Sequence, residues 1–536
     1  MKESDVAVEP IRILVADLIS ESGLDILRQG PGFTVQVSTG LSGEDLAAAV
    51  REHHGLVVRS ATKVTADVLA NPGLLKVIGR AGTGVDNIDL EAATRAGVVV
   101  LNTPGGNSLA AAELTISLLM ALARHIPQAN AALRARRWAR KEFMGSEVSG
   151  KTLGVMGLGR IGREVARRGV ALDMEVTGYD PYVSSEAMAD MGVRSGSLDE
   201  VLAAADFVSL HLPLTDETRR LMNADRFAAM KKGARLINCA RGGLVDEEAL
   251  LSALESGHLS GAALDVFVTE PPSDWRLVEH PRVVSTPHLG ASTVEAQERV
   301  GSDVARKIRD YLESGTVLDA VNLPSVSREE QAVLRPVMDL AERLGRLLGQ
   351  ISAGAMSGLQ LQCFGDFNHR PLRPLMMAAV KGLLSPVLAD EVSYVNALSL
   401  AGQRGITVSE GRSNEVTPYT GLLRLRLATE QAETAVAGSL FGADYARLVE
   451  VDGVQVECRL EGHLLFFRNL DVPGVVGRIG TILGKEDINI AGIQLGRSGI
   501  HGGAVSLVSV DSPVPERALS LIRDLPEIRM VRSIKV

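Results

Sequence analysis

The sequence predicts an α/β protein with two doubly wound parallel sheets, followed by two smaller α+β units. Short apolar runs alternate with helical patterns from residue 11 to residue 312. This alternation is typical of parallel sheets that carry helices on both faces. A glycine-rich turn at residues 157–162 joins one apolar run to a helix, and the last 75 residues follow the order βαββαβ. That order indicates a ferredoxin-like split unit.

Length and composition are those of a globular protein with about three to five domains. Of the 536 residues, 46% are hydrophobic and 23% are charged. The net charge of −9 and the aromatic content of 3% argue against a nucleic-acid partner. Three scattered cysteines predict neither a disulfide framework nor a metal site, which fits a cytoplasmic location. We expect no membrane partner, because the most apolar helical stretch, residues 109–123, is too short to span a bilayer.

The first sheet is predicted from the apolar runs 11–16, 33–37, 55–58, 76–78 and 98–101. Ligands of such sheets bind beyond the carboxyl ends of the strands. Arg59 and Arg80 stand at two of these ends, and a guanidinium fork matches phosphate or carboxylate geometry. We predict an anion pocket there, which backbone amides near Gly82 and Gly84 can join. The alternative is a pair of surface salt bridges.

The second sheet begins with the apolar run 153–156, which leads into Gly157-x-Gly159-x-x-Gly162 and a helix. The next strand ends in Asp180. This is the dinucleotide-binding pattern in its required context, because the glycines let backbone amides approach a pyrophosphate at a helix N-terminus. Asp180 can accept hydrogen bonds from ribose hydroxyls and would repel a 2′-phosphate, so NAD is favoured over NADP. The alternative is a plain strand-to-helix turn.

Two crossings are predicted between the sheets. The second sheet continues through the runs 207–210, 234–238, 261–266 and 283–285, and a long helix at about 294–312 returns the chain to the first sheet. Two α/β units joined twice form a natural hinge with a cleft between them. We therefore assign residues 8–107 and 297–322 to a substrate-binding domain and residues 108–296 to a nucleotide-binding Rossmann domain.

Three residues at or just past strand ends of the second sheet have the side chains that hydride transfer from an alcohol requires. His288 can exchange the hydroxyl proton near neutral pH, and Glu270 can orient its ring. Arg241 can bind a carboxylate and stabilise charge on the reacting oxygen. The alternatives are a structural histidine and a structural Arg–Glu ion pair.

Residues 323–460 are predicted as an α+β domain without chemistry of its own. Asn322-Leu323-Pro324 is predicted to be a linker, helices are expected at about 331–348 and 376–384, and a strand at 359–364. Asp452-Gly453 between two valine-rich runs indicates a hairpin. Residues 462–536 form the split βαββαβ unit.

The motifs at 157–162, 238–243, 265–271 and 286–290 resemble the D-isomer-specific 2-hydroxyacid dehydrogenases. The resemblance covers about residues 11–322 and implies that Arg241, Glu270 and His288 form the catalytic set. It implies a bound NAD, with no metal. The implied dinucleotide contacts are Thr83, Gly157, Gly159, Arg160, Ile161, Gly162, Asp180, Leu212, Cys239, Ala240, Asp265, His288, Gly290 and Ala291.

Within that family, residues 79–87, residues 138–145 and the extra C-terminal part resemble the members that act on phosphoglycerate. This implies oxidation of D-3-phosphoglycerate to 3-phosphohydroxypyruvate, the first step of L-serine biosynthesis, by a homo-oligomer that is a tetramer in the family. The implied substrate contacts are Arg59, Ser60, Arg80, Gly82 and Asn107. The alternatives are a reductase for 2-oxoglutarate or for glyoxylate and hydroxypyruvate, and an NADH-sensing scaffold.

The last 75 residues resemble an ACT regulatory domain. The resemblance implies that Asn469, Asp471 and Asn489 bind serine at an interface between two such domains, which implies feedback inhibition. The alternative is a Pro-Gly turn that caps a helix. Residues 323–460 resemble the intervening domain of the long form, but residues 442–447 lack the basic and histidine side chains that some relatives use for an extra anion site.

Overall fold

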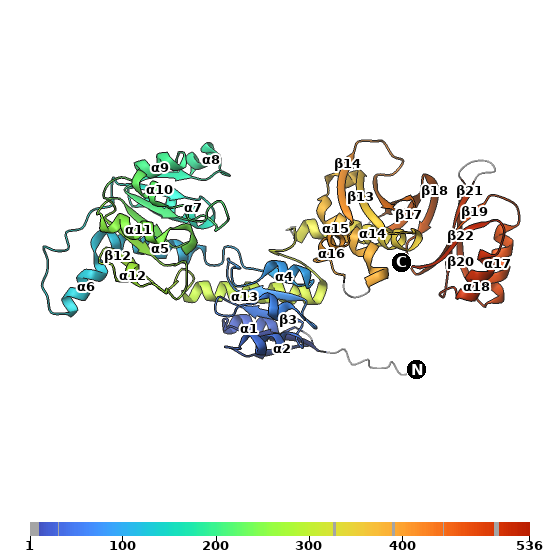
Figure 1. Ribbon diagram of the computed structural model, residues 1–536, viewed down its shortest axis with the longest axis horizontal. Coiled ribbons are helices and arrows are strands. Elements are labelled where there is room, and N and C mark those ends of the chain that lie inside the picture. The colour runs from blue at the N-terminus through green and yellow to red at the C-terminus, as the bar shows by residue number, and fades with distance from the viewer. Residues whose placement is uncertain (1–9, 31, 325–327, 389–391, 443, 498–502) are drawn as a thin grey trace.

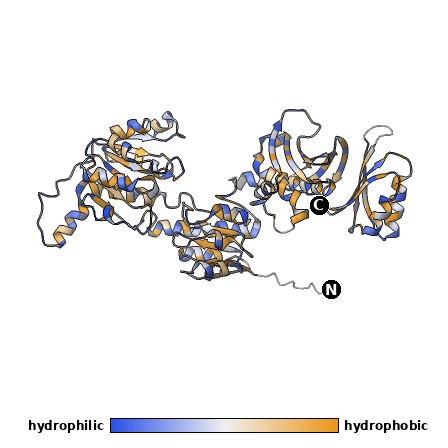
Figure 2. Ribbon diagram, in the orientation of Figure 1, coloured by the Kyte–Doolittle hydropathy of each residue, from blue (hydrophilic) through white to orange (hydrophobic). Residues whose placement is uncertain are grey.

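The computed structural model describes residues 10–30, 32–324, 328–388, 392–442, 444–497 and 503–536. Four sheets follow one another along the chain. In Figure 1 the two α/β units of the N-terminal part lie on one side, and the two smaller units lie together on the other. Figure 2 shows that the hydrophobic residues concentrate on the strands and on the inner faces of the helices. The predicted fold class is confirmed.

The first sheet is parallel throughout, in the order β2-β1-β3-β4-β5. Its strands are β1 (Ile11–Val15), β2 (Phe33–Val37), β3 (Gly55–Val58), β4 (Val77–Arg80) and β5 (Val99–Leu101). Its helices are α1 (Glu21–Arg28), α2 (Gly43–Val50), α3 (Ala66–Leu69) and α4 (Leu90–Arg95). The long helix α13 (Val294–Ser314) returns to this sheet, because Val304 and Ile308 belong to the same buried cluster as Ile13, Val15 and Val77.

The second sheet is also parallel, in the order β12-β11-β10-β9-β6-β7-β8. Its strands are β6 (Thr152–Met156), β7 (Glu175–Tyr179), β8 (Arg194–Ser195), β9 (Phe207–Leu210), β10 (Arg235–Asn238), β11 (Gly261–Leu264) and β12 (Val283–Ser285). The helical segments are α5 (Ser108–Arg124), α6 (Ile126–Arg134), α7 (Arg160–Ala171), α8 (Ser185–Asp190), α9 (Leu198–Ala204), α10 (Ala224–Ala229), η1 (Gly242–Leu244), α11 (Glu247–Glu255) and α12 (Arg276–Glu279). The strand order reverses at β6, where such sheets bind their ligands.

The third sheet has the order β14-β13-β15-β16-β17-β18 and is antiparallel except for the parallel pair β13–β14. The strands are β13 (Met356–Gly365), β14 (Thr407–Ser413), β15 (Gly421–Thr429), β16 (Glu433–Phe441), β17 (Tyr445–Val451) and β18 (Val454–Arg459). The helical segments are α14 (Arg328–Ile351), η2 (Asp366–His369), α15 (Leu372–Leu388) and α16 (Ala397–Gln403). The predicted hairpin is confirmed, since Asp452 and Gly453 join β17 to β18 with φ values of 48° and 78°.

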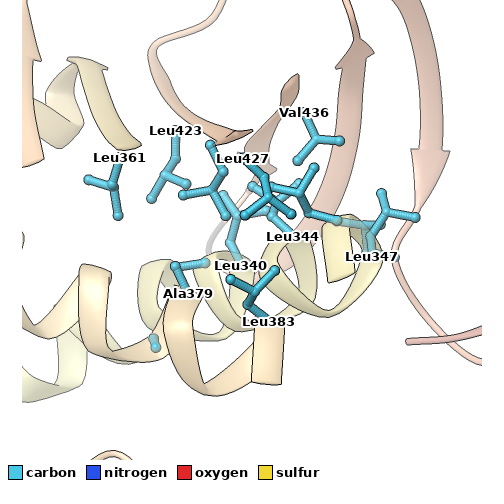
Figure 3. Packing of buried hydrophobic residues seen from close by; sticks show 14 of the residues in the cluster. Leu340, Leu344, Leu347, Leu361, Ala379, Leu383, Leu423, Leu427 and Val436 are labelled. Atoms are coloured by element: carbon cyan, nitrogen blue, oxygen red, sulfur yellow. The ribbon is translucent and has the colours of Figure 1, made fainter. Parts of the chain in front are cut away.

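Helices α14 and α15 pack closely beneath this sheet. A Cβ at Gly345 would overlap the carbonyl oxygen of Ala379, and one at Gly382 would overlap that of Glu342. Glycine is therefore needed at both positions for the two helices to approach. Figure 3 shows Leu340 and Leu344 of α14 beside side chains of the sheet.

The fourth sheet has the order β20-β21-β19-β22, which confirms the ferredoxin-like unit. Its elements are β19 (His463–Leu470), α17 (Val475–Lys485), β20 (Ile490–Arg497), β21 (Gly503–Val510), α18 (Glu516–Arg523) and β22 (Ile528–Lys535). Leu465 and Phe467 face the two helices, whereas Leu464 and Phe466 belong to the cluster built around α14. The last two units therefore share one hydrophobic core, which was not predicted from the sequence.

Among the described residues, no single helix has both the length and the apolar character needed to cross a membrane. The pair α5 and α6 passes that test only when taken together, and it is bent by 62°.

Candidate active site

The glycine turn between β6 and α7 has the geometry that a bound pyrophosphate requires. Gly157 has φ of 93°, and a Cβ at Gly162 would overlap the carbonyl oxygen of Gly157. Gly159 is the N-cap of α7, makes no side-chain cap, and has no atom within 4 Å of the place where a Cβ would lie. Gly159 therefore leaves space for a ligand at the N-terminus of α7, the positive end of the helix dipole. These residues fit a dinucleotide phosphate.

Asp180, at the end of β7, is tied to this turn. One carboxylate oxygen accepts a hydrogen bond from the Leu158 amide at 2.8 Å, and the other accepts from the Tyr182 amide at 2.9 Å. The side chain thus holds the glycine turn and the end of β7 in register. Its remaining lone pairs are in the place where ribose hydroxyls bind in folds of this kind.

Glu270 and His288 form a hydrogen-bonded pair. Nδ1 of His288 donates to Oε2 of Glu270 at 2.6 Å, and both side chains are partly exposed. This bond raises the pKa of His288 above its ordinary value. Burial raises the pKa of Glu270, but the hydrogen bonds from His288 and from the Phe267 amide lower it by more. The pKa of Glu270 therefore lies below the ordinary value. The pair is therefore an ionised carboxylate that stabilises a protonated imidazole.

The loop that carries His288 is held by the buried Asp265. His288 has a left-handed backbone, with φ of 54°, and its amide donates to the Asp265 carbonyl at 2.9 Å. The Asp265 carboxylate accepts from Thr286 Oγ1 at 2.6 Å, from the Leu289 amide at 2.7 Å and from the Gly290 amide at 2.9 Å. Burial raises the pKa of Asp265 against these bonds. Asp265 and Gly290 therefore lie in the wall behind His288.

Arg241 follows β10 and reaches the other α/β unit. The Asn238 side chain fixes the turn, because Nδ2 donates to the Arg241 carbonyl at 2.9 Å and Oδ1 accepts from the Ala240 amide at 3.0 Å. Nε of Arg241 donates to Oδ2 of Asp86 at 3.0 Å. A Cβ at Gly84 would overlap Nη2 of Arg241. The guanidinium of Arg241 therefore lies against the loop that follows β4.

A second guanidinium, that of Arg80, lies close to this contact. Burial, together with the nearby charges of Arg241 and Arg59, lowers the pKa of Arg80 to about 10, although Asp86 and Asp17 act in the opposite direction. The Arg80 guanidinium also lies against the buried Gly82, where a Cβ would overlap Nη1. Three guanidinium groups thus share one electrostatic environment at the carboxyl ends of β3, β4 and β10.

The loop after β3 is pinned by two side chains that were not singled out from the sequence. The buried Asp17 accepts from the amides of Arg59 at 2.6 Å and of Thr62 at 3.1 Å. Asn87 donates to the carbonyls of the same two residues, at 2.7 Å each. Arg59 and the neighbouring Ser60 are therefore held on this edge of the sheet. The available signal for Asp17 was its position directly after the predicted apolar run 11–16.

The predicted residues Thr83, Asn107 and Arg160 lie around the first crossing. Oγ1 of Thr83 donates to Oδ1 of Asn107 at 2.8 Å, and Asn107 is the N-cap of α5. The Arg160 side chain comes from the start of α7 and lies close to Gly105. The crossing thus brings residues of both units next to the glycine turn.

The other predicted cofactor residues have apolar or small side chains and belong to the nucleotide-binding unit. Burial raises the pKa of the Cys239 thiol to about 12, so Cys239 is a neutral wall residue. Leu212 and Ala240 are partly buried against one core cluster, and Ile161 is partly buried against another. Ala291 is half-buried beside Gly290. Among the described residues, no group of His, Cys, Asp or Glu side chains is arranged to hold a metal ion.

The three predicted regulatory residues do not converge within one chain. Asp471 follows β19 and forms an ion pair with Arg497 at the far end of β20, at 3.2 Å. Asn469 is buried, and its Oδ1 accepts from Ser506 at 3.3 Å. Asn489 precedes β20 and donates to Asp511 at 2.7 Å, at the opposite end of the sheet from Asp471. A site that contains all three therefore needs a second chain.

Comparisons with known proteins agree with this arrangement. The model for the NAD binding domain of D-isomer specific 2-hydroxyacid dehydrogenases matches residues 116–290. The D-3-phosphoglycerate dehydrogenase intervening domain matches residues 333–452, and the ACT domain matches residues 463–527. Among solved structures, the TT0316 protein from Thermus thermophilus is 39% identical, with a TM-score of 0.54, and the match covers 58% of this chain and 100% of that one. A glyoxylate reductase from Paecilomyces thermophila is 30% identical, with a TM-score of 0.54, covering 58% of this chain and 98% of that one.

Curated relatives match this chain over almost its whole length. The D-3-phosphoglycerate dehydrogenase of Synechocystis is 44% identical over 98% of this chain and 95% of its own length. That of Bacillus subtilis is 40% identical over 98% of this chain and 99% of its own. That of Methanocaldococcus jannaschii is 42% identical over 98% of this chain and 100% of its own. The chain is therefore an oxidoreductase that uses a nicotinamide dinucleotide, and it belongs to the D-3-phosphoglycerate dehydrogenase branch of the D-isomer-specific 2-hydroxyacid dehydrogenase family.

Proposed function

We propose that the chain oxidises D-3-phosphoglycerate to 3-phosphohydroxypyruvate with NAD, the first step of L-serine biosynthesis. The observation that carries this proposal is the convergence of Arg80, which lies against Gly82, and Arg241, which lies against Gly84 and Asp86, on the loop after β4, with the charge of Arg59 nearby. Asp86 and Asp17 offset part of this positive charge, and the remainder favours an anionic ligand. A substrate with a carboxylate at one end and a phosphate at the other supplies both anions.

The catalytic roles follow from the geometry of the three side chains. Glu270 occupies Nδ1 of His288, which leaves Nε2 to take the substrate hydroxyl proton during oxidation and return it during reduction. Arg241 binds the carboxylate and stabilises charge on the reacting oxygen, so substrate would compete with Asp86 for this guanidinium. The dinucleotide supplies the hydride acceptor when it is bound, held by the amides at the start of α7.

The preference for NAD rests on Asp180. Its carboxylate is held at the end of β7 by two backbone amides, and a 2′-phosphate placed there would meet a negative charge. We expect NAD to be used at least tenfold better than NADP, as a ratio of kcat/KM. Equal use of the two would contradict this role for Asp180.

A substrate panel tests the proposal. D-3-phosphoglycerate, D-glycerate, D-2-hydroxyglutarate and glycolate are each assayed with NAD, and the matching keto acids with NADH. Because a charge-assisted contact contributes about 1.5–3 kcal/mol, D-3-phosphoglycerate should exceed D-glycerate by about tenfold to a hundredfold in kcat/KM. Preference for D-2-hydroxyglutarate would instead support a 2-oxoglutarate reductase, which also binds two anionic groups. No turnover of any hydroxyacid would support an NADH-sensing scaffold.

We also propose that serine inhibits the enzyme through the ACT domain. Asp471 stands at the first strand–helix turn, and its side chain is only 16% exposed beside Arg497. Added serine should inhibit the wild type, and Asp471→Ala should raise the concentration for half-inhibition by about tenfold or more, because a charged hydrogen bond is lost. The exposed Asp524→Ala, in the same domain, is the matched control and should respond as the wild type does. Unchanged inhibition in Asp471→Ala would remove it from the site.

A homo-oligomer, with the family's tetramer as the expected form, is part of the proposal. Helix α6 and the segment after it project from the nucleotide-binding unit (Figure 1) and carry large exposed apolar side chains. Leu133 is 58% exposed, Trp138 84% and Met144 82%. Such patches are typical of subunit interfaces. Trp138→Glu should therefore reduce the mass measured by light scattering, and an unchanged mass would exclude this surface.

A further inference from the structure

The loop that carries Glu270 is held by a second glutamate from a different element. Oε1 of Glu247, in the first turn of α11, accepts a hydrogen bond from the Val268 amide at 2.8 Å. The preceding amide, that of Phe267, donates to Oε1 of Glu270 at 3.1 Å. Two consecutive amides are therefore bound by two carboxylates, one from within the loop and one from outside it.

The same loop is also fixed from the other side. A Cβ at Gly242 would overlap the backbone of Phe267, so the loop lies directly on the residue that follows Arg241. Gly242 and Glu247 belong to one short segment, η1 and the start of α11. This segment therefore sets both the position of Arg241 and the position of Glu270.

The surroundings of Glu247 distinguish it from its neighbours. It lines a cleft of about 670 Å³ together with Arg219, Arg220, Asp246, Glu248, Asp274 and Arg276. In this cleft Arg276 forms ion pairs with Glu248 and Asp274, and Arg220 lies 3.9 Å from Asp246. Glu248 is thus engaged with a cation on the outer face, whereas Glu247 binds the backbone of the Glu270 loop.

We propose that Glu247 is a positioning residue for the reaction, which holds the Glu270 loop so that Glu270 stays in contact with His288. The link is short: Glu247 holds the Val268 amide, Glu270 lies two residues further on, and its other oxygen accepts from His288 at 2.6 Å. The charged groups that face His288 are Glu270, Asp265 and Arg241, and Glu247 acts on the first of these. The proposal rests on the proposed dehydrogenase reaction for its kinetic consequence.

The test compares Glu247→Ala, Glu247→Gln and the matched control Glu248→Ala in the full chain. The first readout is the pH dependence of His288 carbethoxylation by diethyl pyrocarbonate, followed on the His288 peptide by mass spectrometry without substrate. In Glu247→Ala the midpoint should move to lower pH, because the bond that raises the pKa of His288 is loosened. Glu247→Gln keeps an oxygen acceptor, and it and Glu248→Ala should retain the wild-type midpoint.

The second readout is the rate of oxidation. A loosened Glu270 loop should lower kcat by about tenfold to a hundredfold in Glu247→Ala, since small displacements of catalytic groups have effects of this size. The KM for NAD should change little. An unchanged midpoint and rate in Glu247→Ala, or the same shift in Glu248→Ala, would overturn the proposal. If the wild type fails to oxidise phosphoglycerate, the proposed function fails, while the carbethoxylation midpoint still tests Glu247.

Discussion

His288→Ala should lower kcat by about a hundredfold to ten-thousandfold, the range that a positioned general acid–base contributes. The imidazole is the group placed to exchange the substrate proton, because Glu270 holds its Nδ1 at 2.6 Å and leaves the other nitrogen for the reaction. NADH binding, followed by its fluorescence, should remain largely intact, because the glycine turn lies at the start of α7, whereas His288 lies in the loop after β12. Near-normal turnover in this variant would remove His288 from the mechanism.

The pH dependence supplies an independent check on the same pair. Oxidation requires a neutral imidazole, so kcat/KM should rise with pH through the pKa of His288, at a higher pH than for an ordinary histidine. Reduction requires the protonated form and should fall over the same interval. In Glu270→Gln the hydrogen bond that raises this pKa is weakened, so the pH profiles of oxidation and of reduction should both move to lower pH. Unchanged pH profiles in this variant would show that Glu270 does not set the pKa of His288.

A histidine after a strand is ambiguous in the sequence, and the two examples in this sheet show why. His211 comes directly after β9, and His288 comes shortly after β12. Burial lowers the pKa of His211 to about 4, and its Nε2 lies 2.8 Å from Ser209 Oγ. His288 instead has a carboxylate from another strand's loop. Burial and partners decide the role, and neither is local in sequence.

Local patterns were sufficient for the elements and for the side chains at strand ends. Periodicity and turn residues predict the parallel sheets, and parallel strands bring their carboxyl ends to one edge, which is why Arg59 and Arg80 meet. Arg241 joins them from the second sheet, through the contact between the two α/β units. Contacts between loops of different elements were not predictable. Asp86 on Arg241 and Glu247 on the Val268 amide depend on packing distances. The core shared by the last two units likewise depends on which face of β19 remains uncovered.

Arg241→Gln should lower kcat/KM for oxidation by about a hundredfold to a thousandfold, as expected when a donor to the reacting oxygen is removed. The guanidinium is aimed by three features: the Asn238 turn, the ion pair with Asp86 at 3.0 Å and the close approach to Gly84. Arg241→Lys should recover little of the loss, because an ammonium is a point charge and cannot form the two parallel bonds of a guanidinium. Full recovery by lysine would mean that charge alone is required.

Gly84→Ala tests the placement of this guanidinium without removing it. The new Cβ would overlap Nη2 of Arg241, and the flexible end of the arginine can move away, so the loss should appear in kcat/KM and not in thermal stability. Gly43→Ala, at an open position of the same unit, is the matched control. Combined with Arg241→Gln, Gly84→Ala should add almost nothing, because two changes that act on one group are not additive. A full additional loss in the double variant would mean that Gly84 acts on catalysis independently of Arg241.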